Sequence, residues 1–399
     1  MAPNVRHLHV FCAVARQQSI SAAARAIHLT QPAVTQAVAC LEEYFGASLF
    51  NRGSTGMTLT DAGAACHQRI ERALAQIAEG VSEATRSVRS DKARQITTAQ
   101  LRALCAVIEH GSFSVAARAL DLSQPTIHRA ARELERLMGV VLFEKTSFGV
   151  RPTRESEKLG RRANLAFAEI AQARAEVSAL SGEHTGGTVI GAMPLARSFL
   201  VPKALVQFAA DNPNHDIAIV EGPYENLRVG LLQGKVDFLV GALRNPSTLQ
   251  DIVQEHLFDD PLAIIVRAGH PLAGSRRVTV KMLAEFPWVA PRHGSPLHEH
   301  FNELFESANI VPPPHPIECN SLVAARSLLI ESDRVMLLSA HQIHYELQTG
   351  LLAALPHPQG KVVRSIGLTF RRDWHPTAHQ QLLLDQLRGE ARTLAAGRN

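Results

Sequence analysis

The sequence has few cysteines, few aromatic residues and no long hydrophobic run. Its 399 residues include five cysteines, an odd number, and none of them stands in a Cys-x-x-Cys pair. We therefore expect reduced thiols in a cytoplasmic protein rather than a disulfide framework. The longest apolar runs, such as Leu262 to Val266, are far too short to span a bilayer, and no secretory signal is visible. We expect no membrane partner.

Enzyme signatures are missing as well. The sequence has no G-x-S-x-G, P-loop, HExxH or dinucleotide-binding motif, so we predict no enzyme, no catalytic residue and no cofactor. Three histidine groups have ligand-like spacing, namely His298-Glu299-His300, His341/His344 and His315/Cys319. None has the convergent Cys/His pattern of a zinc site, so we interpret them as solvated surface and predict no metal ligand. Metal sensing stays as an alternative.

Composition and charge indicate a globular protein with a basic N-terminal half. Apolar residues make up 46% and charged residues 20%, and the length suggests roughly two to four domains. Residues 1–95 hold 10 Lys and Arg against 7 Asp and Glu, and residues 96–182 hold 12 against 9, so each segment has a net charge of +3. The whole chain has +4, which leaves −2 for the remainder. A phosphate-binding function would use the basic half.

The most informative feature of the sequence is an internal repeat. Residues 19–50 (SISAAARAIHLTQPAVTQAVACLEEYFGASLF) return at residues 112–143 (SFSVAARALDLSQPTIHRAARELERLMGVVLF). The offset is 93 throughout, and 15 of the 32 aligned residues are identical without a gap. A repeat of this kind determines the architecture.

Each copy has the pattern of a winged helix-turn-helix. In the first copy, apolar residues recur at helical spacing with a break at His28-Leu29-Thr30, which predicts two helices and a turn. Thr30 is placed to cap the second helix, Pro32 suits its first turn, and Gly46 ends it. A turn-rich segment, Asn51 to Gly56, and a strand, Met57 to Thr60, predict the wing. The second copy repeats these features with Ser123, Pro125, Gly139 and a wing around Phe148-Gly149.

Both copies resemble the N-terminal domain of LysR-type transcriptional regulators. The shared motif is an AARxL-type helix, then S/T-Q-P, then LE, then G-x-x-LF and a Thr after the wing. In such domains the second helix enters the major groove of double-stranded DNA, and the wing and helix N-terminus contact phosphates. The family normally has one such domain, so the duplication is a departure. The predicted DNA-binding residues are Gln31, Pro32, Thr35, Gln36, Arg52, Gln124, Pro125, His128, Arg129, Arg132 and Lys145.

The two recognition helices differ in charge. The first, Gln31 to Phe45, has no Lys or Arg and a formal charge of −2, whereas the second has Arg129 and Arg132 on one face. Because arginine binds guanine or phosphate and glutamine supplies no charge, we predict that the second copy provides most of the affinity. The first copy would add contacts, pack against its twin or mediate assembly. The alternative is that both arginines are only solvated surface charges.

A long helix is predicted after each copy, at Ala64 to Arg89 and at Glu155 to Leu180, each with one apolar stripe. The resemblance implies that such a helix pairs with its symmetry mate, so we expect a homodimer or tetramer. An apolar stripe of this kind is also compatible with packing inside one chain.

The C-terminal half alternates strands and helices after a linker at Ser181 to Gly187, which predicts a parallel α/β sheet. The predicted strands are Gly187–Ala192, Asp216–Glu221, Phe238–Ala242, Leu262–Arg267, Trp288–Ala290, Val335–Leu338 and Ser365–Phe370. The predicted helices are Pro202–Asp211, Tyr224–Gln233, Pro296–Ala308, Ser321–Ile330 and Pro376–Leu394. This half resembles the effector-binding domain of the same family, built like a type 2 periplasmic binding protein. The match rests on IGAMPLARSFLVP, the turn from Leu231 to Asp237, the segment that ends in GHPLA, and Glu318-Cys319-Asn320-Ser321. The resemblance implies two lobes, and the chain would cross from lobe I to lobe II near Arg267 and return near Arg364.

Ligands of such folds bind at the carboxyl ends of strands and at helix N-termini. The predicted effector residues are Met193, Pro194, Arg197, Ser198, Tyr224, His293, Gly294, Ser295, Asn320 and Ser321. These groups suit a small anion, such as an organic acid, or a sugar-like ligand. Alternatively, Ser295 and Ser321 are only helix caps and Arg197 pairs with a surface carboxylate.

The sequence thus predicts a multidomain regulator of the LysR type, with two mainly α winged helix-turn-helix domains, long linker helices and a two-lobed α/β effector domain. Its expected partners are DNA, a small-molecule effector, a second copy of itself and RNA polymerase. The alternative is a metal-responsive or effector-independent regulator that uses the α/β domain only to oligomerise. The predicted domains are 4–63 and 96–154 (winged helix-turn-helix), 64–95 and 155–182 (linker helices), and 187–399 (effector domain, with lobe I at about 187–267 and 365–395 and lobe II at about 268–364).

Overall fold

The computed structural model describes residues 3–53, 56–86, 91–147, 149–183, 185–245 and 251–396. The chain forms two compact units, one of residues 1–188, 212–218 and 229–236, the other of residues 189–211, 219–228 and 237–399. None of the helices in the described ranges is long and apolar enough to cross a bilayer. Several predicted features lie outside the described residues, namely Ser54 and Thr55 of the first wing, Phe148 of the second, the helix end at Arg89 and His184 of the linker.

The first unit contains both helix-turn-helix copies. Their helices are α1 (Val5–Gln17), α2 (Ile20–Ala26) and α3 (Gln31–Phe45), then α5 (Thr98–His110), α6 (Phe113–Ala119) and α7 (Gln124–Met138), with a 3-10 turn η1 (Asp91–Gln95) before α5. The predicted caps are confirmed, because the hydroxyls of Thr30 and Ser123 accept hydrogen bonds from N–H groups in the first turns of α3 and α7. Gly46 and Gly139 end these helices with φ of 72° and 71°.

Each copy continues into a two-stranded antiparallel wing, as predicted. The strands are β1 (Phe50–Gly53) with β2 (Gly56–Leu59), and β3 (Phe143–Thr146) with β4 (Gly149–Pro152). A glutamate of each recognition helix holds the start of its wing. Glu42 accepts from the N–H of Leu49 and Glu135 from that of Leu142, each at 2.9 Å. The glutamate of each LE pair thus binds the backbone of the leucine in the following LF pair, which explains why both pairs recur in the repeat.

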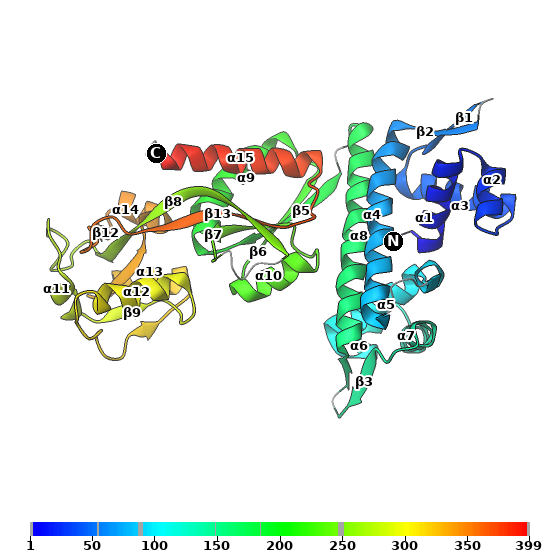
Figure 1. The fold of residues 1–399 in the computed structure, drawn as a ribbon. Coiled ribbons are helices and arrows are strands. Elements are labelled where there is room, and N and C mark those ends of the chain that lie inside the picture. Colours follow the sequence, from blue (N-terminus) through cyan, green and yellow to red (C-terminus); the bar gives the residue numbers. More distant parts are fainter. Residues whose placement is uncertain are drawn as a thin grey trace. The chain divides into compact units, whose positions relative to one another are not determined.

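The two long helices pair with each other inside the chain (Figure 1). They are α4 (Asp61–Thr85) and α8 (Arg154–Leu180), which start at the N-caps Thr60 and Thr153. Their apolar stripes are buried, with Ile70 and Ile77 on α4 and Leu159, Ile170 and Val177 on α8 all at most 1% exposed. Each such side chain contributes about 1.5–3 kcal/mol by burial. The stripes therefore act as core within one chain.

Among the described residues, the C-terminal part contains one nine-stranded sheet, and it is mixed rather than parallel. Its strands are β5 (Gly186–Ala192), β6 (His215–Val220), β7 (Phe238–Ala242), β8 (Ile252–Arg267), β9 (Trp288–Ala290), β10 (Ile317–Glu318), β11 (Val335–Ser339), β12 (Leu352–Leu355) and β13 (Val363–Arg371). The order is β10-β9-β11-β8-β13-β7-β5-β6, with β12 also paired to β8. Pairs β5–β7 and β9–β11 are parallel, but β13 and β8 run antiparallel to their neighbours. The prediction of a parallel sheet is wrong because these two strands carry the chain between two groups of strands.

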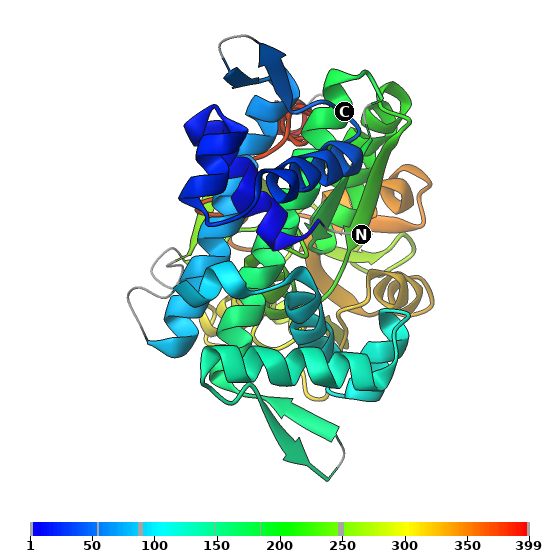
Figure 2. The same cartoon turned by 90° about the vertical axis from the view of Figure 1, so that its right-hand side faces the viewer.

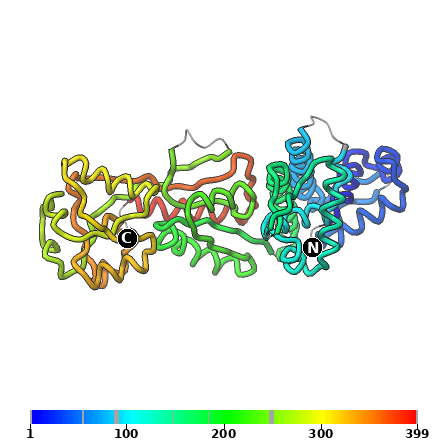
Figure 3. Tube along the Cα trace, turned by 90° about the horizontal axis from the view of Figure 1, so that it is seen from below, coloured from blue at the N-terminus to red at the C-terminus, as the bar shows by residue number. Residues whose placement is uncertain are grey.

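Strand β8 is much longer than predicted, and it changes partners along its length. From Ile252 to Pro261 it pairs with β13, and from Leu262 to Arg267 it pairs with β11 and β12. The chain therefore passes between the two groups at Pro261–Leu262 rather than near the predicted Arg267, because one continuous strand serves both. The return at the start of β13 falls near the predicted Arg364. In Figure 3 the second group is yellow to orange, whereas the first combines green segments with the orange-red β13.

The second group of strands comprises β9 to β12 and the end of β8 from Leu262 to Arg267. Helices cover both of its faces. Side chains of β8 alternate, so that Ile264 and Val266 join one apolar cluster and Ile265 joins another on the opposite face. The helical segments of this part are η2 (Ala196–Leu200, a π-helical turn), α9 (Val201–Asp211), α10 (Tyr224–Leu232), α11 (Val280–Ala284), α12 (Pro296–Glu306), α13 (Leu322–Ile330), η4 (Ala340–Ile343), α14 (His344–Gln348) and α15 (Ala378–Ala395).

Candidate functional site

The second recognition helix and its wing form a groove that gathers four of the predicted DNA-binding residues. The groove measures about 290 Å³, and its lining includes Gln124, His128, Arg132 and Lys145. Gln124, His128 and Lys145 are exposed, and so is Arg129, which no carboxylate of the described chain approaches within ion-pair distance. The rings of His128 and Phe113 pack edge to face, with 5.1 Å between their centroids. Exposed donors on a helix N-terminus beside a wing suit a DNA groove.

Arg132 is engaged within its own helix. Its guanidinium donates to Glu135 at 2.6 Å, and the arginine side chain is 40% exposed. Because Glu135 also accepts from the N–H groups of Leu142 and Phe143, the carboxylate is fixed and Arg132 must leave it in part to contact DNA. Arg129 is therefore the more available of the two arginines predicted to bind DNA from α7.

The first recognition helix presents polar, uncharged groups. Gln31, Pro32 and Gln36 are exposed, and Thr35 is half-buried. The Thr35 hydroxyl donates to the carbonyl of Gln31 at 3.0 Å, and the Gln36 amide contacts Cys40 Sγ at 3.5 Å. Arg52 matches Lys145 in the repeat and is exposed on β1. It is the cation that the first copy contributes to the predicted DNA-binding residues.

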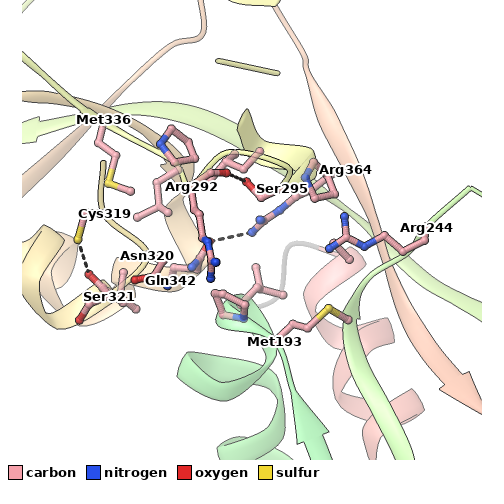
Figure 4. A pocket seen from close by; sticks show the side chains of 18 residues that line it. Met193, Arg244, Arg292, Ser295, Cys319, Asn320, Ser321, Met336, Gln342 and Arg364 are labelled. Carbon is pink, nitrogen blue, oxygen red and sulfur yellow. Dashed lines mark hydrogen bonds between the residues drawn. The ribbon is translucent and has the colours of Figure 1, made fainter. Parts of the chain in front are cut away.

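A cavity of about 150 Å³ lies between the two groups of strands in the second unit (Figure 4). Apolar side chains make up most of its wall, and three arginines also line it: Arg244, Arg292 and Arg364. The described residues of the lining include no aspartate or glutamate. Of the predicted effector residues, five line this cavity: Met193, Pro194, Ser295, Asn320 and Ser321.

Arg244 lines both this cavity and a wider, open groove, and Tyr224 lines the groove beside it. The Arg244 guanidinium lies over the Tyr224 ring, 4.5 Å from its centroid. Within the described chain, Arg244 Nε and the Tyr224 hydroxyl are buried without a hydrogen-bond partner. Burial lowers the pKa of Arg244, against the opposing influence of Tyr224 and Glu225. Because buried polar groups are normally hydrogen-bonded, we expect a bound ligand to supply an acceptor for these two donors.

Arg244 is not among the predicted effector residues, although its position in the sequence gives a signal. The residue follows β7 by two positions, at the carboxyl end of a strand, which is where ligands of such sheets bind. Arg364 also lines the cavity, although the sequence predicts it only as a crossing point.

The remaining predicted effector residues lie in or near the open groove. Arg197, Tyr224, His293 and Gly294 line it, whereas Ser198 lines neither space and its hydroxyl turns back to the carbonyl of Pro194. Arg197 forms an ion pair with Glu221, as in the alternative interpretation. Ser295 and Ser321 cap α12 and α13, so they have the structural role and line the cavity as well. His293 pairs with Glu318 at 3.0 Å.

Arg364 is held in place by a buried carboxylate, Asp260, on the strand that joins the two groups. The distance between Arg364 Nη2 and Asp260 Oδ2 is 2.8 Å, and Ser339 and His341 also contact this aspartate, at 2.6 and 3.0 Å. Burial raises the pKa of Asp260, but hydrogen bonds from His341 and Ser339 and the charge of Arg364 outweigh it, so the pKa is lowered. Gln342 accepts a further bond from Arg364 at 2.8 Å.

Replacing Asp260 with asparagine is expected to destabilise the second unit by about 3–5 kcal/mol at neutral pH, because it leaves Arg364 buried without a counter-charge. A lowered folded-state pKa gives stability that is present above the unfolded value, about 3.9, and is lost as pH falls through the folded value. The difference between wild type and Asp260→Asn should therefore shrink below about pH 4. Urea midpoints followed by tryptophan fluorescence measure it, and a constant difference from pH 7 to pH 2.5 would contradict the assignment.

The histidine groups do not converge in the described chain. His298 Nδ1 lies 2.9 Å from the carbonyl of Pro291, His341 contacts Asp260, and the ring of His344 packs against Phe199. His298 is buried, so its interpretation as solvated surface is wrong, because it lies in the first turn of α12 and its ring packs against that of Phe301. A different group, Cys12, His67 and Glu71, places three ligand-type atoms within 4.8 Å of one another. Burial raises the pKa of the Cys12 thiol to about 12, which favours the protonated form over a metal-binding thiolate.

Comparison with known protein families agrees with this geometry. A profile described as "LysR substrate binding domain" matches residues 181–392. A second profile, "Bacterial regulatory helix-turn-helix protein, lysR family", matches twice, at residues 5–64 and 98–157.

Individual relatives are transcriptional regulators rather than enzymes. The HTH-type transcriptional regulator GalR of Pseudomonas putida is 33% identical over 92% of this chain and 92% of its own length. The regulator PcaQ of Agrobacterium fabrum is 31% identical over 76% of this chain and 98% of its own. A solved structure of full-length OxyR from Pseudomonas aeruginosa, 22% identical, aligns with a TM-score of 0.53 over 74% of this chain and 94% of that one, and this likeness concerns the fold alone.

A LysR-family profile covers more than half of the chain, and a relative 33% identical covers nearly all of it. The chain therefore belongs to the LysR family of transcriptional regulators, which bind DNA through a helix-turn-helix domain and carry an effector-binding domain.

Proposed function

We propose that this regulator binds double-stranded DNA through tandem modules at residues 4–63 and 96–154, under the control of a small organic acid bound between the two lobes of residues 187–399. Two observations support an acidic effector. Arg244 Nε and the Tyr224 hydroxyl are buried donors without a hydrogen-bond partner in the described chain. The described lining of the adjoining cavity has three arginines and no carboxylate. An anion supplies both the acceptor oxygens and the missing charge.

The wall of the cavity favours an acid with an apolar body over a sugar. Met193, Leu195, Leu297, Met336 and Leu338 line it, and these side chains offer no hydrogen bond to a ring of hydroxyls. A polyhydroxylated ligand would leave most of its hydroxyls unpaired there, which costs roughly 1–3 kcal/mol for each buried group. The organic acid is therefore the better match of the two predicted classes.

Replacing Arg244 with glutamine is expected to abolish the thermal stabilisation by carboxylate ligands. A ligand at about 100 times its Kd stabilises the folded state by about 2.7 kcal/mol, which corresponds to a rise in Tm of roughly 5–10 °C. The measurement is a thermal-shift screen of the full chain with benzoate-type and short aliphatic acids and with neutral sugars. Arg276→Gln, at an exposed arginine outside both cavities, is the matched control. Stabilisation by a sugar but by no acid would contradict the proposed class.

A further inference from the structure

The ion pairs between α4 and α8 follow the register of the sequence repeat. Arg69, which is 2% exposed, reaches three residues of α8: its guanidinium lies 3.2 Å from Glu169, 2.6 Å from Gln172 and 2.6 Å from Glu176. Burial alone lowers the pKa of Arg69, but the hydrogen bonds and charges of Glu176 and Glu169 raise it above its ordinary value. This arginine is thus tied to the opposite helix at one end of the pair.

Arg162 makes the same contacts in the opposite direction. It stands 93 residues after Arg69, and its guanidinium lies 2.8 Å from Gln76, 2.7 Å from Glu79 and 2.5 Å from Glu83. Each of these three residues precedes a partner of Arg69 by 93 positions, since 76, 79 and 83 correspond to 169, 172 and 176. Reciprocal contacts between equivalent positions are the signature of a two-fold interface.

A second set of contacts, on other helices, obeys the same symmetry. Val5 and Thr98 are equivalent positions, 93 residues apart, and they meet each other: the N–H of Val5 donates to Thr98 Oγ1 at 2.9 Å. The Thr98 hydroxyl in turn donates to the carbonyl of Pro3 at 2.7 Å. A residue that touches its own equivalent lies on the two-fold axis. The N-termini of α1 and α5 therefore meet at the axis that also relates α4 to α8.

We infer that the two modules of one chain form an internal pseudo-dimer that reads both halves of an unequal inverted repeat in a single DNA duplex. The inference rests on the proposed DNA-binding function of the modules. Within the first unit, Figures 1 and 2 show the two wings at opposite ends, with both sets of recognition elements on the same side of the α4–α8 pair. The strong half-site belongs to α7, which carries Arg129, and the weak half-site to α3, which has no cation.

The pairing surface has no room for a second chain. Gly80 lies so close to α8 that a Cβ there would stand 2.8 Å from the Cβ of Arg162, and the equivalent position on α8 is the small residue Ala173. The close approach and the buried ion pairs occupy the face through which a separate copy would pair. The partner is therefore a duplex with two different half-sites, about one helical turn or a multiple of it apart.

The first test separates pairing within the chain from pairing between chains. Arg162→Glu, and separately Glu79→Arg/Glu83→Arg, place like charges across the interface. Each is expected to weaken binding at least about tenfold, because the two half-sites are no longer read together. The probe is a duplex that the wild-type chain selects from a random library. The chain that combines all three changes should return to within about threefold of wild type, whereas an equal mixture of the two variant chains should not recover.

Recovery in the mixture would overturn the inference, because it would show that α4 of one chain pairs with α8 of another. Helical circular dichroism of each variant guards against simple unfolding, and the combined variant must regain any missing signal. If the wild-type chain selects no duplex, the DNA-binding function fails, while recovery of the helical signal in the combined variant still tests the pairing.

A second test uses the DNA. Base changes in one half-site should cost much more affinity than changes in the other, and Gln36→Ala should remove the base preference only in the weaker half-site. If both half-sites are equally sensitive and Gln36→Ala affects neither preference, two chains each contribute only α7, and the internal pseudo-dimer is wrong.

Discussion

Replacing Arg129 and Arg132 with alanine is expected to weaken DNA binding by about 10²- to 10⁴-fold. The reason is that each arginine contact to a base or phosphate contributes about 1–3 kcal/mol. Gln36→Ala on the first recognition helix is expected to cost no more than about tenfold, since it removes one neutral side chain. Fluorescence anisotropy with a labelled duplex measures both. The dependence of log K on log salt should also become shallower by roughly 0.9 for each phosphate that the variant no longer neutralises.

Arg136→Ala is the control for this comparison, because it removes the same charge from the exposed surface near the end of α7. A small effect there, beside a large one at Arg129, separates specific contacts from the general attraction of a basic helix. Equal reductions in affinity for Gln36→Ala and the double variant would remove the distinction between the two modules.

Arg69→Ala is expected to destabilise the first unit by about 3–5 kcal/mol. The substitution removes the buried guanidinium that pairs with Glu176, and it leaves Glu169 with only the more exposed Arg72 as a counter-charge. Removing one partner of a buried ion pair is strongly destabilising. The two tryptophans, Trp288 and Trp374, both belong to the second unit. Urea unfolding followed at 222 nm should therefore shift by roughly 1–3 M, while the fluorescence transition stays in place.

Arg72→Ala is the matched control, because Arg72 lies one turn further along α4 and shares the partner Glu169 at 3.0 Å, but is 28% exposed. A partly exposed pair of this kind is expected to contribute less than about 1 kcal/mol. If Arg69→Ala moves both transitions equally, or neither, the buried ion pairs do not stabilise the helix pair specifically.

Local signals made the helix-turn-helix copies predictable. Thr30, Ser123, Gly46 and Gly139 act within one helical turn, so their positions in the sequence suffice to place the ends of α3 and α7. The pairing of α4 with α8 depends instead on contacts about 100 residues apart, which an apolar stripe alone does not assign to a partner. The repeat itself held the missing signal, since Arg69 and Arg162 and their partners match at the same offset.

The sheet and the cavity were less predictable, for a physical reason. Strand direction follows from long-range pairing, and β13 returns antiparallel beside β7 and β8 although its own residues look like those of any buried strand. The two-residue β10 is too short to leave a pattern. Predicted cavity residues at helix N-termini, such as Ser295, were found at the cavity, whereas Arg244 on a loop and the inward turn of Ser198 depend on packing.

A DNase footprint on DNA upstream of the protein's own gene, with wild type and the Arg129→Ala/Arg132→Ala variant side by side, tests whether the two modules of one chain read DNA unequally. We expect the second module to anchor the complex and the first to add weaker contacts. Wild type should therefore protect two half-sites, and the variant should protect neither, because α3 alone binds too weakly to hold the chain. A shortened footprint that survives over one half-site would contradict the account, since it would show that the arginine-free helix reads DNA independently.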